Sequence, residues 1–196
     1  MDKIPEESPN SNTPKHHEHV CPMWLAPFLS TPLRRIFQNP EKLLAPYLSP
    51  GQTAADIGCG PGYFTIPMAR RVGKEGRVYA IDLQPEMLAL VKKAAIKAGV
   101  ENRVHAVTAR TETLNFPEKV DFALTFWAAH EVPDQLNFYR EVAGMLKPGG
   151  RFLLIEPKLH TEESYMKDAR DLLVRLGLKY LGPVNVRLSM AMLFEK

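Results

Sequence analysis

The sequence predicts an α/β protein whose seven-stranded, mostly parallel, doubly wound sheet carries helices on both faces. From residue 53 onward, short apolar segments alternate with segments of helical periodicity, and this alternation is typical of parallel strands joined by crossover helices. The apolar segments are apolar almost throughout and end in polar or glycine residues, as strands buried on both faces do. A chain of 196 residues corresponds to one domain of this kind.

Local patterns set the predicted bounds of each strand and helix. The predicted strands are seven short apolar runs at 53–57, 78–81, 104–107, 122–126, 152–156, 178–181 and 187–194. Apolar residues spaced three and four apart predict helices over 64–72, 86–99, 134–146 and 162–176. A further helix is predicted to start at Asn39-Pro40-Glu41, where proline occupies the first turn, and to run to about Leu48.

Composition and charge exclude several classes of protein. The 25 Lys and Arg residues exceed the 22 Asp and Glu residues by only three, which is too small an excess for a dedicated nucleic-acid binder. Two cysteines cannot build a disulfide framework. The longest apolar run, 122–129, is too short to cross a bilayer, and the first 20 residues lack the apolar core of a signal peptide. We therefore expect a cytoplasmic protein without a membrane or nucleic-acid partner, and the sequence does not indicate its oligomeric state.

The N-terminal part of the chain differs in composition from the rest. Nine of the 17 prolines lie in residues 1–50, and none of the 12 glycines do. Residues 1–15 show no apolar periodicity and are predicted to be a disordered tail. Residues 16–39 contain short amphipathic stretches, which we expect to form a helical lid over the carboxyl edge of the sheet. The main domain is then expected to span residues 40–196.

A glycine-rich loop, Asp-Ile-Gly-Cys-Gly-Pro-Gly at 56–62, joins the first predicted strand to the next helix. Glycines allow positive φ and let a ligand approach the backbone closely. A dinucleotide-binding loop requires the pattern G-x-G-x-x-G, but its third glycine would fall at residue 63, which is tyrosine. The Gly-Lys-Ser/Thr of a phosphate-binding loop is also missing from this stretch. The loop favours a different ligand, with a turn that binds nothing as the alternative.

Three further motifs follow the glycine loop. Ile81-Asp82 ends the second predicted strand, 120–124 contributes to the fourth, and 146–150 forms a predicted turn before the fifth. Together the four motifs resemble those of class I S-adenosylmethionine-dependent methyltransferases of the small type 11 kind, and some enzymes of ubiquinone and menaquinone biosynthesis look similar over this core. The resemblance covers residues 40–194. It implies a Rossmann-like fold, S-adenosylmethionine as the cofactor, and methyl transfer by in-line displacement.

The resemblance also implies the cofactor-binding residues. Asp82 would accept the ribose hydroxyls, the three glycines would lie under the methionine part of the cofactor, and Asp56 would hold its ammonium group. Cys59 fits as a small space-filling residue in the loop. Apolar contacts at the adenine edge are expected from Leu83 and Met87. The complete predicted set is Asp56, Gly58, Cys59, Gly60, Gly62, Asp82, Leu83, Met87, Arg110, Thr111 and Thr125.

One position departs from the pattern of this family. Many relatives carry an acid after the third strand that hydrogen-bonds the adenine amino group, and Arg110 occupies that place here. Either Glu112 substitutes for the acid or backbone groups near Thr111 bind the adenine.

The catalytic candidate is His130. It follows the fourth predicted strand, where the methyl group is expected, and imidazole can exchange protons near neutral pH. A histidine that only forms hydrogen bonds within the loop is the alternative. Glu131 is either its partner or a solvent-facing residue, and Trp127 either packs in the core or stacks on the substrate.

A second cluster, His16-His17-Glu18-His19-Val20-Cys21, precedes the lid's apolar residues. Its side chains could belong to a solvated tail, contact substrate, or bind a metal. A second ligand pair of matching spacing is missing from the sequence, so no metal ligands are assigned.

The acceptor is expected to be a small molecule. The modest charge disfavours nucleic acid, and the scarcity of thiols disfavours arsenite. Two other functions stay open: a cofactor-binding protein without catalysis, in a structural or regulatory role, and an NAD-dependent oxidoreductase.

Overall fold

The computed structural model of the chain describes residues 39–116, 118–159 and 161–196. These residues form a seven-stranded sheet of order β3-β2-β1-β4-β5-β7-β6, which confirms the predicted fold class. The strands are β1 (Thr53–Ile57), β2 (Arg77–Asp82), β3 (Val104–Thr108), β4 (Val120–Phe126), β5 (Leu146–Pro157), β6 (Lys179–Pro183) and β7 (Ser189–Glu195). The predicted tail, and the predicted lid except for Asn39, lie outside the described residues.

The direction of the strands places a ligand-binding crevice in the sheet. Strands β1 to β5 pair in parallel, whereas β7 runs antiparallel to β5 and β6. The strand order changes direction between β1 and β4. At such a switch point the neighbouring connections diverge to opposite faces and leave a crevice at the carboxyl ends of the strands.

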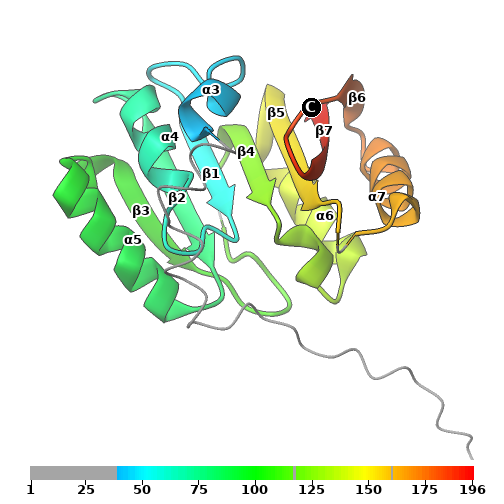
Figure 1. Ribbon diagram of the computed structural model, residues 1–196, viewed down its shortest axis with the longest axis horizontal. Coiled ribbons are helices and arrows are strands. Elements are labelled where there is room, and N and C mark those ends of the chain that lie inside the picture. Colours follow the sequence, from blue (N-terminus) through cyan, green and yellow to red (C-terminus); the bar gives the residue numbers. More distant parts are fainter. Residues whose placement is uncertain (1–38, 117, 160) are drawn as a thin grey trace, which may run out of the picture.

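Helices cover both faces of the sheet (Figure 1). On one face, α3, α4 and α5 pack with side chains such as Phe122 and Leu153, and on the other, α6 and α7 pack with Ala123 and Leu154. Neighbouring residues of β4 and β5 thus enter opposite cores, because successive strand side chains point to opposite faces. The helices are α3 (Pro40–Leu44), α4 (Thr65–Val72), α5 (Pro85–Ala98), α6 (Gln135–Met145) and α7 (Glu163–Arg175), with 3-10 turns η2 (Glu101–Arg103) and η3 (Ala129–Glu131).

Several predicted boundaries differ from those of the structure, and three of the differences have a clear cause. Helix α3 stops at Leu44 rather than near Leu48, because Pro46 has no N–H to continue the helical ladder. Strand β5 begins at Leu146, since the expected turn at 146–150 instead pairs with the chain end, where Gly149 donates to the Lys196 carbonyl. Strand β7 begins at Ser189 rather than at 187, because Leu188 has a φ of 60° and so cannot extend a strand.

The connection between β3 and β4 contains no helix among its described residues. Its first part folds back on itself, and Arg110 and Thr113 exchange backbone hydrogen bonds. No helix in the described part of the chain is long and apolar enough to cross a membrane.

Candidate active site

A cavity of about 330 Å³ opens at the carboxyl ends of β1, β2 and β4, at the point where the strand order changes direction. The glycine loop and the loops after β3 and β4 line it. Its position agrees with the general location of ligands in open α/β sheets.

The glycine loop reaches this position through left-handed backbone conformations. Gly58, Gly60 and Gly62 have φ values of 70°, 50° and 91°, which side chains rarely allow. A Cβ atom on Gly58 would lie 2.4 Å from the Cβ of Ala128, so the glycine lets the loop after β4 approach. Gly62 does not line the cavity, and a Cβ there would meet Val91 of α5 at 3.3 Å. Its space therefore serves helix packing, and its predicted place under the ligand stays a prediction.

Asp82 stands at the tip of β2 and lines the cavity. Its Oδ2 accepts the N–H of Gly60 at 2.9 Å, and its Oδ1 accepts the N–H of Gln84 at 2.9 Å. Oδ2 also accepts the Cys59 thiol at 3.9 Å. Burial raises the pKa of this carboxyl, while the backbone N–H donors oppose the shift. The geometry is suited to binding a pair of vicinal hydroxyls.

Asp56, the penultimate residue of β1, is a second acid that lines the cavity. It is 2% exposed, and its Oδ2 accepts the Thr65 hydroxyl at 2.5 Å. A buried carboxylate favours a cationic ligand group, because the charge is costly to bury without compensation. Cys59 lies between the two acids, and burial together with both carboxylates raises the pKa of its thiol well above the usual value. The thiol therefore stays protonated and is a poor nucleophile.

The charges of the site distinguish between two cofactor classes. In a dinucleotide site, loop N–H groups point at an anionic pyrophosphate. Here the N–H groups of Gly58 and Cys59 both donate to the Ile81 carbonyl, and that of Gly60 donates to Asp82. Two acids beside the loop repel a pyrophosphate and attract a cation. S-adenosylmethionine carries an ammonium, a sulfonium and a ribose, so the residues present fit it.

Leu83, Met87, Arg110, Thr111 and Glu112 also line the cavity. Met87 is 2% exposed and Leu83 is 44% exposed, so Met87 forms a buried apolar wall and Leu83 an exposed one. Glu112 and the chain around Thr111 both reach the cavity, so both sequence alternatives for binding adenine stay open.

Thr125 is not among the residues that line the cavity. It is fully buried, and its hydroxyl has no hydrogen-bond partner within the described residues. Its predicted contact with the cofactor stays a prediction.

His130 also lines the cavity, from the turn η3. Its Nδ1 is 2.5 Å from Oε2 of Glu156, the penultimate residue of β5, and the two side chains are 24% and 0% exposed. This hydrogen bond raises the pKa of His130 above its usual value, against the opposing effect of burial. Burial in turn raises the pKa of Glu156. Glu131, which the sequence offered as a partner of His130 or a solvent-facing residue, also raises the pKa of His130, but its effect is the smallest of the causes.

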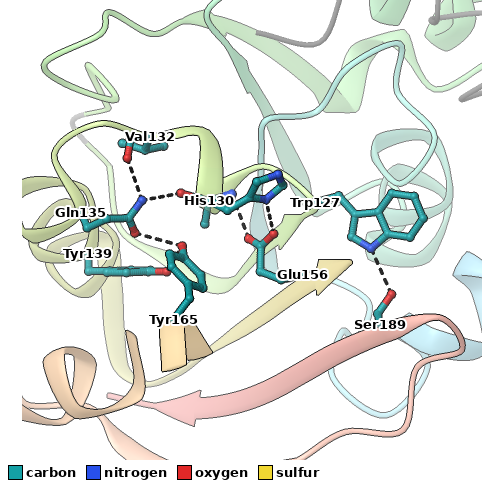
Figure 2. A network of polar contacts seen from close by, with 9 residues as sticks. Trp127, His130, Val132, Gln135, Tyr139, Glu156, Tyr165 and Ser189 are labelled. Carbon is teal, nitrogen blue, oxygen red and sulfur yellow. Dashed lines mark hydrogen bonds and ion pairs between the residues drawn. The ribbon is translucent and has the colours of Figure 1, made fainter. Parts of the chain in front are cut away.

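Trp127 both packs and lines the cavity. Its ring lies against Phe126, with the ring centroids 5.1 Å apart, and its indole N–H donates to the Ser189 hydroxyl at 3.0 Å (Figure 2). Its φ of 59° is unusual for a non-glycine residue and is typical of functional loops.

Sequence reasoning missed Glu156. An acid at the end of the apolar run 152–155 is the one signal that could have found it, because a fully buried carboxylate requires partners. Among the described residues, no three or more His, Cys, Asp or Glu side chains are grouped so as to hold a metal ion, and the predicted His16–Cys21 cluster lies outside those residues.

Comparison with known proteins identifies the class. The methyltransferase domain family matches residues 55–154, which span the glycine loop, Asp82, His130 and most of β5. A solved S-adenosylmethionine-dependent methyltransferase from Aquifex aeolicus superposes with a TM-score of 0.78 at 25% identity, over 87% of this chain and 96% of that one. The chain belongs to the methyltransferase domain family.

Among curated proteins, this chain is similar to enzymes of quinone biosynthesis. The ubiquinone/menaquinone biosynthesis C-methyltransferase UbiE of Vibrio cholerae is 35% identical over 108 residues, which are 55% of this chain and 42% of that protein. The demethylmenaquinone methyltransferase of Bacillus cytotoxicus is 29% identical over 138 residues, 70% of this chain and 56% of the relative. The matched part of the chain thus spans about half the length of these relatives.

Replacing Gly58 with alanine tests the floor of the cavity. An L-residue at this φ costs about 1–2 kcal/mol, and the added methyl would meet Ala128. We expect a lower midpoint of thermal unfolding together with weaker cofactor binding, measured by calorimetry. Gly99→Ala is the matched control, because its φ of 65° is also positive, nothing lies within 4 Å of the added carbon, and it is not among the residues that line the cavity. Equal losses of cofactor affinity in the two variants would contradict the proposed approach of the two loops.

Proposed function

We propose that this protein transfers a methyl group from S-adenosylmethionine to a small-molecule acceptor that carries an acidic proton. The observation that supports this most directly is the pair of acids, Asp56 and Asp82, that line one cavity at the switch point of the sheet. Membership of the methyltransferase domain family supports the same reaction class.

The bound cofactor would supply a methyl group on a positively charged sulfur, and the sulfur is the leaving group when a nucleophile attacks the methyl carbon. The protein residues hold and orient the reactants. Asp82 accepts the ribose hydroxyls, Asp56 stabilises the ammonium group, and the glycine loop allows close approach of the backbone. Aligning two reactants in this way removes much of the entropic cost of their meeting.

His130 is proposed as the base that takes a proton from the substrate that receives the methyl group. Its Nδ1 is engaged by Glu156, so Nε2 is the nitrogen left for substrate. A base at this position takes the proton from the acceptor as the acceptor attacks the methyl carbon. A substrate whose hydroxyl or acidic C–H group is methylated needs such a base, because its proton must leave as the new bond forms.

The acceptor is proposed to be an aromatic hydroxy compound of the quinol type. The cavity that His130 lines is also lined by Tyr63, Phe126 and Trp127, whose faces suit a flat ring. The curated relatives named above act in quinone biosynthesis, which favours this class over amines and thiols.

A methyl-transfer assay tests the proposal. The full chain is incubated with S-adenosylmethionine labelled in its methyl group and with a panel of unprenylated quinols, catechols, primary amines and thiols. We expect label to enter the quinols or catechols and the demethylated cofactor to accumulate in equal amount. Transfer to amines alone would overturn the acceptor class. Tight cofactor binding with no transfer to any acceptor would favour the non-catalytic alternative.

A further inference from the structure

We infer that Glu156 is a positioning residue of this site: it fixes His130 in the tautomer whose bare Nε2 faces the acceptor. The inference deepens the proposed function and rests on it for the chemistry. The placement itself rests only on contacts among the chain's own residues.

Both carboxylate oxygens of Glu156 form hydrogen bonds with the turn that contains Ala129 and His130. Its Oε1 accepts the backbone N–H of Ala129 at 3.0 Å, and its Oε2 lies 2.5 Å from Nδ1 of His130. The carboxylate has no solvent exposure. An ionised carboxylate can only accept hydrogen bonds, so it requires a proton on Nδ1. Neutral His130 therefore carries its hydrogen on Nδ1, and Nε2 holds the free lone pair.

A second set of contacts holds the same turn from its carbonyl side. Gln135 donates from Nε2 to the carbonyls of Ala129 and Val132, at 2.6 and 2.7 Å. Its Oε1 accepts the Tyr165 hydroxyl at 3.0 Å, and Tyr165 lies 2.9 Å from the Tyr139 hydroxyl. Figure 2 shows this network, with Glu156 and Gln135 reaching the turn from different sides. Side-chain hydrogen bonds thus fix the backbone around His130 at an N–H group, that of Ala129, and at two carbonyls, those of Ala129 and Val132.

The groups facing the pair come from several elements. Glu156 acts from β5 and Glu131 from the turn itself, and both raise the pKa of His130. Tyr139 of α6 and Tyr165 of α7 face Glu156, and burial raises the pKa of each phenol above its usual value, so both stay neutral. Glu156 is accordingly the main cause of the raised pKa of His130.

In the proposed step, the acceptor's proton moves to Nε2 of His130 while the acceptor's electron pair forms the new bond to the methyl carbon. The bond between that carbon and sulfur breaks, and its electron pair stays on sulfur, which becomes a neutral thioether. His130 leaves the step as an imidazolium, whose charge the Glu156 carboxylate compensates. A later exchange with solvent returns the proton.

Glu156→Gln separates positioning from packing, because it keeps the shape and removes the charge. The amide oxygen is expected to stay on the Ala129 N–H, which leaves the NH₂ group against Nδ1. The imidazole must then accept at Nδ1 and carry its hydrogen on Nε2, where it can no longer take a proton. We expect the pKa of His130 to fall from above 6.5 to that value or below, because burial then acts with only Glu131 opposing it. We expect turnover to drop by about 10²–10⁴-fold, as for the loss of the base itself.

The test uses nitrogen-15 NMR of the histidine side chains of the full chain without cofactor, with the His130 signal assigned from a His130→Gln variant. Wild-type protein should show the Nδ1–H tautomer and a pKa above 6.5, and Glu156→Gln should show the opposite tautomer. Glu131→Gln is the matched control and should change the pKa only slightly and leave the tautomer as in wild type.

Several outcomes would overturn the inference. An Nε2–H tautomer in wild-type protein would do so without any variant. A Glu156→Gln protein that loses stability but keeps the tautomer and pKa of His130 would show that Glu156 only packs. Because this measurement needs no cofactor or acceptor, its result is independent of whether the methyl-transfer assay succeeds.

Discussion

Replacing His130 with alanine is expected to lower turnover by about 10²–10⁴-fold, the contribution typical of a positioned general base. The affinity for S-adenosylmethionine should stay nearly unchanged, because the side chain lies at the acceptor end of the cavity and Asp56 and Asp82 at the cofactor end. The two quantities are measured by steady-state kinetics with a quinol acceptor and by calorimetry.

The pH dependence of kcat/KM provides the matching check on His130. The base must be unprotonated to act, so the rate should fall as the pH drops below the pKa of His130. Because Glu156 raises that pKa, the acidic limb of the wild-type profile should lie above pH 6.5. The limb should be missing from the His130→Ala profile. A variant with wild-type turnover would return His130 to a purely structural role.

Replacing Asp82 with alanine is expected to weaken cofactor binding by about 10- to 150-fold, the loss typical of one charge-assisted hydrogen-bonding group at about 1.5–3 kcal/mol. The variant removes the acceptor for the ribose hydroxyls and also frees the Gly60 and Gln84 N–H groups that hold the loop. Calorimetric titration with S-adenosylmethionine and with its demethylated product should give similar losses, because both ligands share the ribose.

Asp121→Asn is the matched control for Asp82. Asp121 lies at the start of β4, where it accepts the Thr53 N–H at 2.8 Å and pairs with Lys147 at 2.8 Å, far from the carboxyl edge. We expect lower stability with unchanged cofactor affinity. Unchanged affinity in Asp82→Ala itself would show that the second strand does not carry the ribose.

Local motifs explain which parts of the site the sequence could predict. The glycine loop was found because its glycines directly follow a strand, and Asp82 was found because it ends the next strand, in the order that the methyltransferase motifs have. His130 was found because it follows a strand directly. The strands themselves were found because burial on both faces makes them apolar throughout.

Glu156 was missed because its role depends on tertiary register. It meets His130 because β5 pairs with β4, with Ile155 beside Phe126, and no local pattern specifies that pairing. The packing role of Gly62 could not be predicted for the same reason, because its space is set by α5, a helix more than twenty residues further along the chain.

The central claim is that two acids and a glycine loop make this cavity a site for S-adenosylmethionine and not for a dinucleotide. Isothermal titration of the full chain with S-adenosylmethionine, its demethylated product and NAD tests it most directly. The account predicts binding of the first two ligands, weakened in Asp82→Ala, and no heat of binding with NAD. Tight binding of NAD with none of S-adenosylmethionine would contradict it.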